Sequence, residues 1–294
     1  MGSSALAVSG APSLAPDDEE VLSEIRRLFK RKDYHPPKPP SAALEVRSAA
    51  EREDATIEDV VQLLERDALL AAETLRLAQS PSFASRIAPR TIHEAVMRLG
   101  LRTLVNVVWQ AALAAGVFKA KGYEEAMESL RRHSTATAAL ARFVLQKAGR
   151  GAKSERAFLV ALLHDVGVAA LLVALADGEL EAGSLEEAVP MIEVAHEEAG
   201  LLLTRLWKLP VDLQLALSQH HGVEGDHGGE VDEVQQALDV AQHLAAAHGC
   251  SLVLAGRTLD TVPEAHATAA AESLGLDLES LLEPAAEVVQ AAVR

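Results

Sequence analysis

The chain has 294 residues, of which 49% are hydrophobic and only 3% aromatic, and its formal net charge is −16. Its apolar share is mostly alanine, leucine and valine, which favours packed helices over β-sandwiches or barrels. The acidic balance opposes nonspecific attraction to nucleic acid phosphates or anionic lipid. We therefore expect an all-α protein, long enough for two modest domains, whose partners are proteins or small ligands and not nucleic acid.

Cysteine content and the lack of export signals point to a cytoplasmic protein. Cys250 is the only cysteine, which excludes an intrachain disulfide and a thiolate cluster for zinc. The longest apolar stretch, residues 166–176, is shorter than the roughly 20 residues that cross a bilayer. The first residues lack the basic flank and apolar centre of a signal peptide. We expect no membrane insertion and no export.

The first 40 residues divide into three segments. Residues 1–16 are rich in alanine, serine, glycine and proline without periodicity, which predicts a disordered lead. From Asp17, early acids, later bases and apolar residues at helical spacing predict a short amphipathic helix. A proline-rich spacer, residues 35–40, cannot continue that helix. Residues 17–40 therefore precede a domain that begins at Ser41.

Two helical blocks follow. In residues 41–122, an N-terminal helical subdomain, Thr56 and Asp67 precede apolar runs as helix caps, and Gly100 separates two helices. Residues 123–294 form a second helical subdomain that ends in one or two C-terminal helices. Its predicted breaks fall at Gly149–Gly151, Asp177–Gly178, Gly183–Ser184, Leu209–Pro210 and residues 222–229.

The most informative motif is the adjacent pair His164 and Asp165, which interrupts an otherwise apolar helical run. Polar side chains of this kind are seldom buried without partners. An imidazole and a carboxylate side by side are ligands for zinc, iron or manganese. Other candidate ligands are His133, His196, His220, His221 and Asp239.

Several strings, in this order, resemble the HDOD family, the HD-related output domains of bacterial signalling proteins. They are Asp59–Asp67, Thr74–Ser80, Thr91–Gly100, Arg132–Ser134, Ala157–Gly167, Ala195–Gly200, Leu206–Pro210 and His220–His221. The resemblance covers about residues 36–244. It implies an all-α fold in which a smaller N-terminal bundle packs on a larger one related to HD-domain metal-dependent phosphohydrolases.

The resemblance also implies roles for the candidate ligands. His133 matches the first histidine of HD domains, His164 and Asp165 match the His-Asp pair, and Asp239 matches the last aspartate. The remaining three histidines match the extra histidines of the two-metal HD-GYP branch: His196, His220 and His221. Such a set holds one or two divalent transition-metal ions, iron, manganese or zinc. The alternative is a buried hydrogen-bonded network that holds no metal.

Two functions remain open from the sequence. The first is a noncatalytic regulatory module that binds a protein partner, or a nucleotide as an allosteric signal; the family has no established catalysis. The second is a metal-dependent phosphohydrolase of a nucleotide or cyclic dinucleotide, with Lys153 or Arg156 near the phosphate. The Gly-Tyr-Pro signature of HD-GYP enzymes is absent after His221, which argues against cyclic di-GMP hydrolysis.

Four residues outside the candidate ligand set receive weaker assignments. Trp109 and Trp207 lie in apolar segments with helical periodicity and are predicted to anchor the core or an interface. Cys250 is predicted to be an inert buried thiol. His243 follows Asp239 by four residues, on the same helix face; joining the site is one option, and a solvent-facing or interfacial role is favoured.

Overall fold

A computed structural model gives the fold. It describes residues 16–38, 41–52, 54, 56–66, 68–79, 89–114, 118–218, 230–259 and 261–293. Several predictions lie outside the described residues. They concern the disordered lead up to residue 15, the cap at Asp67, the break at residues 222–229, and the ligands His220 and His221.

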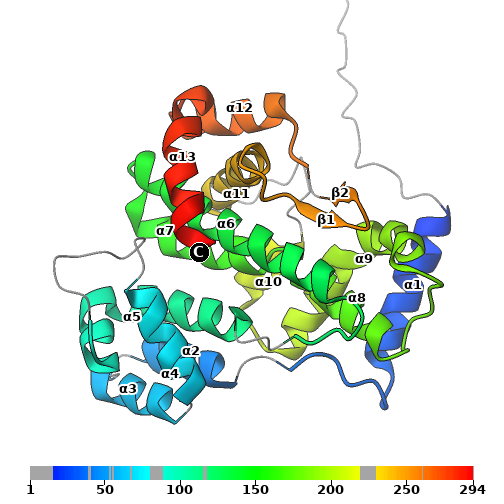
Figure 1. Ribbon diagram of the computed structural model, residues 1–294, viewed down its shortest axis with the longest axis horizontal. Helices are drawn as coiled ribbons and strands as arrows, with labels where there is room; N and C mark the ends of the chain where they lie inside the picture. The colour runs from blue at the N-terminus through cyan, green and yellow to red at the C-terminus, as the bar shows by residue number, and fades with distance from the viewer. Residues whose placement is uncertain are drawn as a thin grey trace, which may run out of the picture.

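The all-α prediction is confirmed, since helices dominate the described chain (Figure 1). The helices are α1 (Pro16–Lys30), α2 (Ser41–Glu51), α3 (Ile57–Glu65), α4 (Ala68–Ala78), α5 (Ile92–Ala114), α6 (Glu124–Lys147), α7 (Gly151–Leu163), α8 (Val166–Ala176), α9 (Leu185–Leu206), α10 (Val211–Ser218), α11 (Glu230–Ala247), α12 (Glu264–Ser273) and α13 (Leu278–Ala292). The strands are β1 (Leu252–Leu254) and β2 (Arg257–Leu259).

Helices α2 to α5 form the smaller bundle, at the lower left of Figure 1. The Thr56 side chain accepts from the Asp59 amide, and the Asp59 side chain accepts from the Thr56 amide, so the predicted cap at the start of α3 is a reciprocal capping box. Gly100 interrupts α5 with φ 72° and ψ 161°, which confirms the predicted break. A left-handed φ of this kind favours glycine.

The larger bundle is built around α6, which packs against α7, α11 and α13. Helix α8 is buried along Val166–Leu175, so a fully apolar helix serves as core. Together α7 and α8, residues 151–176, are long and apolar enough to cross a membrane, but 94% of the apolar 18-residue window within this segment is buried inside the protein. Burial against other helices accounts for this hydrophobicity.

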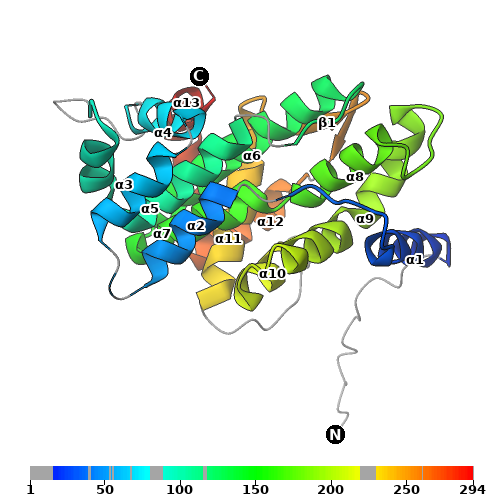
Figure 2. The ribbon, with the colours of Figure 1, turned by 90° about the horizontal axis from the view of Figure 1, so that it is seen from below.

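Helix α1 packs on α9, at the opposite end of the molecule from α2 to α5 (Figures 1 and 2). Its apolar stripe of Leu22, Ile25 and Leu28 is buried, and Arg26 Nε donates to Glu198 at 2.8 Å. The predicted amphipathic helix is confirmed. The spacer that follows crosses back beneath the larger bundle, where Trp207 Nε1 donates to the Pro37 carbonyl at 2.9 Å.

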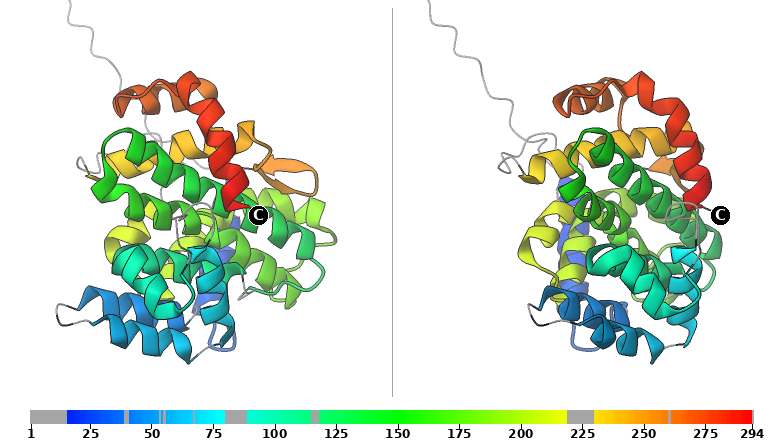
Figure 3. Two further views of the ribbon diagram at one scale, coloured as in Figure 1. Left: turned by 60° about the vertical axis from the view of Figure 1, so that its left-hand side comes forward. Right: turned by 90° about the vertical axis from the view of Figure 1, so that its left-hand side faces the viewer.

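An antiparallel hairpin of β1 and β2 interrupts the second helical block (Figure 3). Its turn residues, Ala255 (φ 49°) and Gly256 (φ 76°), are both left-handed, as a two-residue type I′ loop requires. The expectation of helices alone in residues 123–294 is therefore wrong here. Three-residue strands are too short to show an alternating pattern, and alanine is an uncommon left-handed residue.

Candidate metal centre

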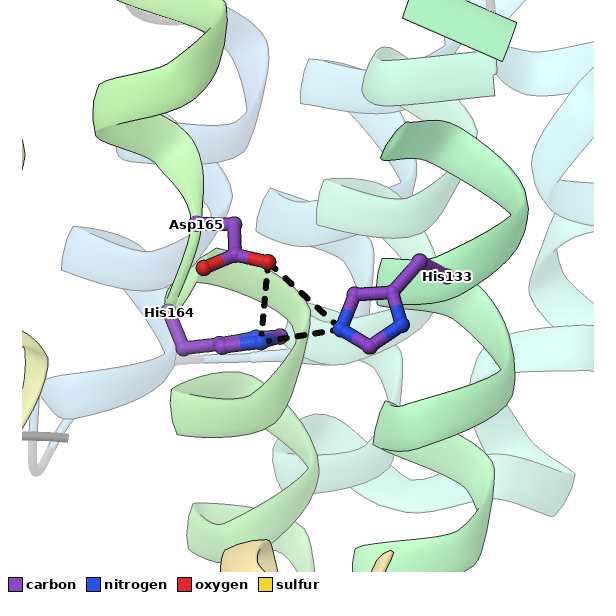
Figure 4. A group of neighbouring side chains, drawn as sticks. All are labelled: His133, His164 and Asp165. Carbon is purple, nitrogen blue, oxygen red and sulfur yellow. Dashed lines mark hydrogen bonds and ion pairs between the residues drawn. The ribbon is translucent and has the colours of Figure 1, made fainter. Parts of the chain in front are cut away.

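Three buried side chains converge at the centre of the larger bundle (Figure 4). His133 extends from the middle of α6, whereas His164 and Asp165 lie between α7 and α8. Only 1%, 1% and 0% of these three residues is exposed, respectively. The His133 and His164 Nε2 atoms are 3.2 Å apart, and Asp165 Oδ2 lies 3.0 Å from His164 Nε2 and 3.5 Å from His133 Nε2.

The break between α7 and α8 presents the His-Asp pair to α6. His164 follows the last residue of α7, and Asp165 precedes the first residue of α8 with φ −97° and ψ 19°. Close packing of α8 on α9 holds this junction, because a Cβ on Gly167 would lie 1.8 Å from the His196 carbonyl oxygen. Only glycine fits at this contact.

Backbone carbonyls set the tautomers of both clustered histidines. His133 Nδ1 lies 2.8 Å from the Cys250 carbonyl oxygen, and His164 Nδ1 lies 2.7 Å from the Ala161 carbonyl oxygen. A carbonyl only accepts, so each Nδ1 carries the proton and donates it. In the neutral rings each Nε2 is therefore an unprotonated acceptor that faces the other, the arrangement found for metal-bound histidines.

The spacing of the three acceptors fits one cation. Ligand atoms about 2.1 Å from one ion lie about 3.0 Å apart at right angles and about 3.4 Å apart at a tetrahedral angle. The observed separations of 3.0, 3.2 and 3.5 Å lie within about 0.1 Å of this range. Two imidazole nitrogens and one carboxylate oxygen suit zinc, iron or manganese better than calcium or magnesium. The donor set therefore fits the implied metal.

The ligand atoms of the three clustered residues all lie within 4.8 Å of one another. Among the residues that the structure describes, no other predicted ligand belongs to this group. His196 is buried, and its Nδ1 lies 3.0 and 2.9 Å from the carbonyl oxygens of Ile192 and Glu193, so its Nε2 is the unprotonated nitrogen in the neutral ring. His196 thus has the tautomer of a ligand and a position on α9, next to the α7–α8 junction.

Asp239 lies on α11 and bridges to α12. Its Oδ2 lies 3.0 Å from His266 Nε2, and its Oδ1 accepts from Gln235 Nε2 at 3.0 Å. His243, one turn further on, has Nδ1 3.3 Å from the Val262 carbonyl oxygen. Sequence reasoning did not foresee the contact with His266, because no spacing links residues 27 positions apart on different helices.

Two further predictions have clear outcomes. Lys153 forms an ion pair with Glu233 at 2.8 Å, so it is already engaged by α11. Cys250 is a buried thiol, as predicted. The functional part of Cys250 is its carbonyl oxygen, which orients His133. No side-chain pattern signals a contact made by a backbone atom.

A two-bundle helical fold with a buried His/His-Asp cluster at a helix junction defines an HD-related domain. The sequence profile of the HDOD domain matches residues 37–223, and the chain belongs to the HDOD family. Helix α1 and the segment from α11 onward, including Asp239, lie outside the matched residues.

Solved structures share this fold. An HDOD domain protein of unknown function from Geobacter sulfurreducens superposes with a TM-score of 0.70 and 20% identity, covering 94% of this chain and 97% of that chain. A presumed metal-dependent phosphohydrolase from Shewanella amazonensis SB2B gives a TM-score of 0.68 at 18% identity, covering 95% of this chain and 100% of that chain. Likeness at this identity establishes the fold alone.

A curated relative extends beyond the matched region. It is an uncharacterized protein of Treponema pallidum (strain Nichols), 27% identical over 196 residues. The alignment covers 64% of this chain but only 38% of the relative. The chain thus matches a part of a longer protein.

Proposed function

We propose that this protein is a noncatalytic signalling module that binds one divalent transition-metal ion at His133, His164 and Asp165 and acts by contact with a regulatory protein. The observation that carries the proposal is the meeting of three buried acceptors, with both Nδ1 protons already donated to backbone carbonyls. Acceptors this close repel one another unless a cation lies between them. A metal ion supplies that cation at neutral pH.

A proton is the competing cation. If one histidine is protonated on both nitrogens, its Nε2 donates to Asp165 and the cluster becomes a buried ion pair. A metal is the better occupant, because one ion contacts all three acceptors at once, whereas a proton on one Nε2 is shared with one acceptor at a time. We therefore expect the protein to bind a metal ion at pH 7, and not to hold these side chains only in a buried hydrogen-bonded network.

When bound, a divalent ion supplies positive charge to the acceptors and polarises any oxygen that it holds. The protein's own residues do the positioning: the carbonyls of Ala161 and Cys250 orient the rings, and Asp165 joins α8 to them. The three side chains are nearly inaccessible to solvent, so a phosphodiester could approach them only from the cavity that borders Asp165. This supports a structural or sensing role for the ion.

Metal analysis of protein purified without chelator tests the proposal. We expect about one equivalent of iron, manganese or zinc, and less than about one tenth of an equivalent in His133→Ala, His164→Ala and Asp165→Asn. His93→Ala is the matched control, since His93 has an exposed side chain and lies 3.5 Å from Glu58 in the smaller bundle. Metal-free wild-type protein that melts unchanged after metal addition would overturn the metal site.

The second candidate is a metal-dependent phosphohydrolase. It is favoured by the donor set and by a cavity that borders Asp165. Metal-loaded protein would then hydrolyse a generic phosphodiester such as bis(p-nitrophenyl) phosphate, and Asp165→Asn would abolish the turnover. Metal bound in about one equivalent with no hydrolysis above the Asp165→Asn background supports the noncatalytic module instead.

A further inference from the structure

A cavity of about 530 Å³ lies between the N-terminal half of α6, the segment that precedes it, and α8. The lining residues of α6 recur at helical spacing from Glu124 to Thr135, so the cavity follows one face of that helix. At its inner end the cavity borders Asp165 of the metal centre. Protein interiors contain few voids larger than a water molecule, so a space of this size is a candidate site for a ligand.

The inner wall of the cavity is aliphatic. It is formed by buried side chains of α6, the end of α7 and the start of α8: Leu130, Leu162, Leu163, Val166 and Ala169. Apart from Asp165, the charged residues that line the cavity are all at least partly exposed, so they belong to its rim. A charged group placed against this wall would lose its hydration without gaining a partner, which is unfavourable.

Two hydroxyls interrupt the aliphatic wall, on Ser134 and Thr135 of α6. Only 7% and 5% of these two residues is exposed, respectively. A serine or threonine within a helix can return its hydrogen bond to the carbonyl one turn earlier, as Thr204 does to Gly200 at 2.8 Å. Among the described residues, neither the Ser134 nor the Thr135 hydroxyl has a hydrogen-bond partner. Both are therefore available to a polar group of a ligand in the cavity.

The charges of the rim balance one another. Glu128 accepts from Arg131 Nε at 2.8 Å, and this contact lowers the pKa of the Glu128 carboxyl. The Gly122 amide, with the nearby charge of Lys121, lowers the pKa of Glu124. At neutral pH the rim therefore has three cations and three carboxylates, and no net charge that selects an ion of either sign. They are Lys119, Lys121 and Arg131, with Glu124, Glu128 and Asp177.

We propose that this cavity binds an uncharged small molecule with an aliphatic body and one hydrogen-bonding head group, such as a hydroxyl or an amide. The body lies on the aliphatic wall, and the head group pairs with Ser134 and Thr135. Apolar walls with a few placed polar groups are typical of sites for small organic molecules. This site goes beyond the proposed function, because it gives the signalling module a small-molecule input whose assigned contacts are not metal ligands.

A stack of three aromatic rings connects the cavity to the smaller bundle. Phe118 borders the cavity and stacks on Trp207, with ring centroids 5.9 Å apart and planes at 11°. Trp207 stacks in turn on Trp109 of α5, also at 5.9 Å. These are the two tryptophans of the chain. We therefore expect a ligand that enters beside Phe118 to change the tryptophan fluorescence of the protein.

Titration with decanol, decanoate and decyltrimethylammonium tests the proposal, with tryptophan fluorescence and calorimetry as readouts. The three probes share a ten-carbon chain and differ in head-group charge. We expect decanol to bind at least about fivefold more tightly than either ion, because only the uncharged head group keeps its hydrogen bonds without a charge to desolvate. An ion that binds as tightly as decanol, or decanol that shows no saturable binding, would overturn the proposal.

Removing the two hydroxyls tests the head-group contact. Ser134→Ala/Thr135→Val should weaken decanol about fivefold. Thr137→Val is the matched control, since Thr137 is fully buried on the same helix, its hydroxyl also lacks a hydrogen-bond partner among the described residues, and it does not line the cavity. The control should bind decanol within about twofold of wild type. Equal decanol affinity in the double variant and the control would contradict the proposal.

Two further variants separate the wall from the rim. Ala169→Leu fills the wall and should weaken decanol about tenfold. Lys119→Ala/Lys121→Ala should leave decanol within about twofold of wild type, because the rim charges are not contacts of an uncharged ligand. A fivefold loss in the lysine variant would show that the rim selects the ligand instead. If Ala169→Leu does not fold, the hydroxyl variant still decides the outcome.

Titration of metal-loaded and chelator-treated protein separates this proposal from the metal centre, which the cavity borders at Asp165. Decanol should bind both forms within about threefold, because the aliphatic wall and the two hydroxyls are present in each. Decanol binding that is lost on removal of the metal would overturn the assigned contacts. A protein that holds no metal and still binds decanol would overturn the metal centre alone.

Discussion

His133 Nε2 and His164 Nε2 lie 3.2 Å apart in the interior of the larger bundle, and each ring donates its Nδ1 proton to a backbone carbonyl. This relationship joins α6 to the α7–α8 junction through two acceptors instead of a donor and an acceptor. In the neutral rings this contact is not a hydrogen bond between the two imidazoles, and a cation placed between the two Nε2 atoms makes it favourable.

Metal binding should stabilise the folded protein. At a free metal concentration about 100 times the dissociation constant, the gain in unfolding free energy is about 2.7 kcal/mol, because the unfolded chain does not assemble the three ligands. Chelator should reverse the gain. Thermal melting with and without added Zn²⁺ or Mn²⁺ measures it, and His164→Ala should show no metal-dependent shift. An equal shift in both proteins would place the ion elsewhere.

Gly167→Ala should be strongly destabilising. A Cβ there meets the His196 carbonyl oxygen at 1.8 Å and the Gly200 amide nitrogen at 2.6 Å, both backbone atoms that cannot rotate away. Helices α8 and α9 must separate, at a cost of at least about 3 kcal/mol in unfolding free energy. Denaturant unfolding is the measurement.

Two other glycines serve as controls for that variant. A Cβ on Gly200 comes no closer than 3.5 Å to its neighbours, and Gly151 has nothing within 4 Å. Gly200→Ala should therefore cost less than about 1 kcal/mol, and Gly151→Ala, at the start of α7, should be neutral or stabilising by about 0.5 kcal/mol. A Gly167→Ala protein as stable as wild type would contradict the close packing of α8 on α9.

A buried ion pair should be costly to break on one side only. Arg142 Nη2 lies 2.8 Å from Glu155 Oε2, which also accepts from Asn106 Nδ2 at 2.7 Å, and the guanidinium lies 3.8 Å above the Phe158 ring. Burial lowers the pKa of Arg142, and Glu155 opposes that effect. Glu155→Gln should lower the unfolding free energy by about 3 kcal/mol because it leaves a buried charge without its partner.

The double variant Arg142→Met/Glu155→Gln tests the cause of that loss. Removing the buried charge as well should recover at least about half of the stability, measured by a double-mutant cycle in urea. Additive losses would show that the two side chains stabilise the fold independently. Asn106 links this pair to α5, so loosening of the smaller bundle should accompany Glu155→Gln.

Asp239 and His266 should behave as a pair that fixes α12 to α11. Their 3.0 Å contact predicts that His266→Ala and Asp239→Asn each lower the unfolding free energy by about 1 kcal/mol, and that the double variant loses little more than either single one. We expect metal content to stay unchanged in both. Loss of metal in Asp239→Asn alone would instead establish Asp239 as a fourth ligand.

Much of the architecture follows from local patterns in the chain. Helical periodicity, the cap at Thr56 and the break at Gly100 depend on residues a few positions apart, so the positions of α1, α3 and α5 could be predicted. The β1–β2 hairpin could not, since each strand spans only three residues. Its formation depends on packing against α6, where Ser129 Oγ accepts from the Val253 amide at 2.9 Å.

The candidate site, too, could be predicted from the sequence only in part. The sequence by itself determined the HDOD family, the all-α class and the adjacency of His164 and Asp165, because these are properties of order along the chain. The resemblance had already grouped His133 with this pair, and only the tertiary structure gave the distances between the three side chains. It also decided that the carbonyl of Cys250 orients the His133 ring and that Asp239 contacts His266. The physical reason is that coordination depends on distances and tautomers, which arise when helices far apart in sequence pack together.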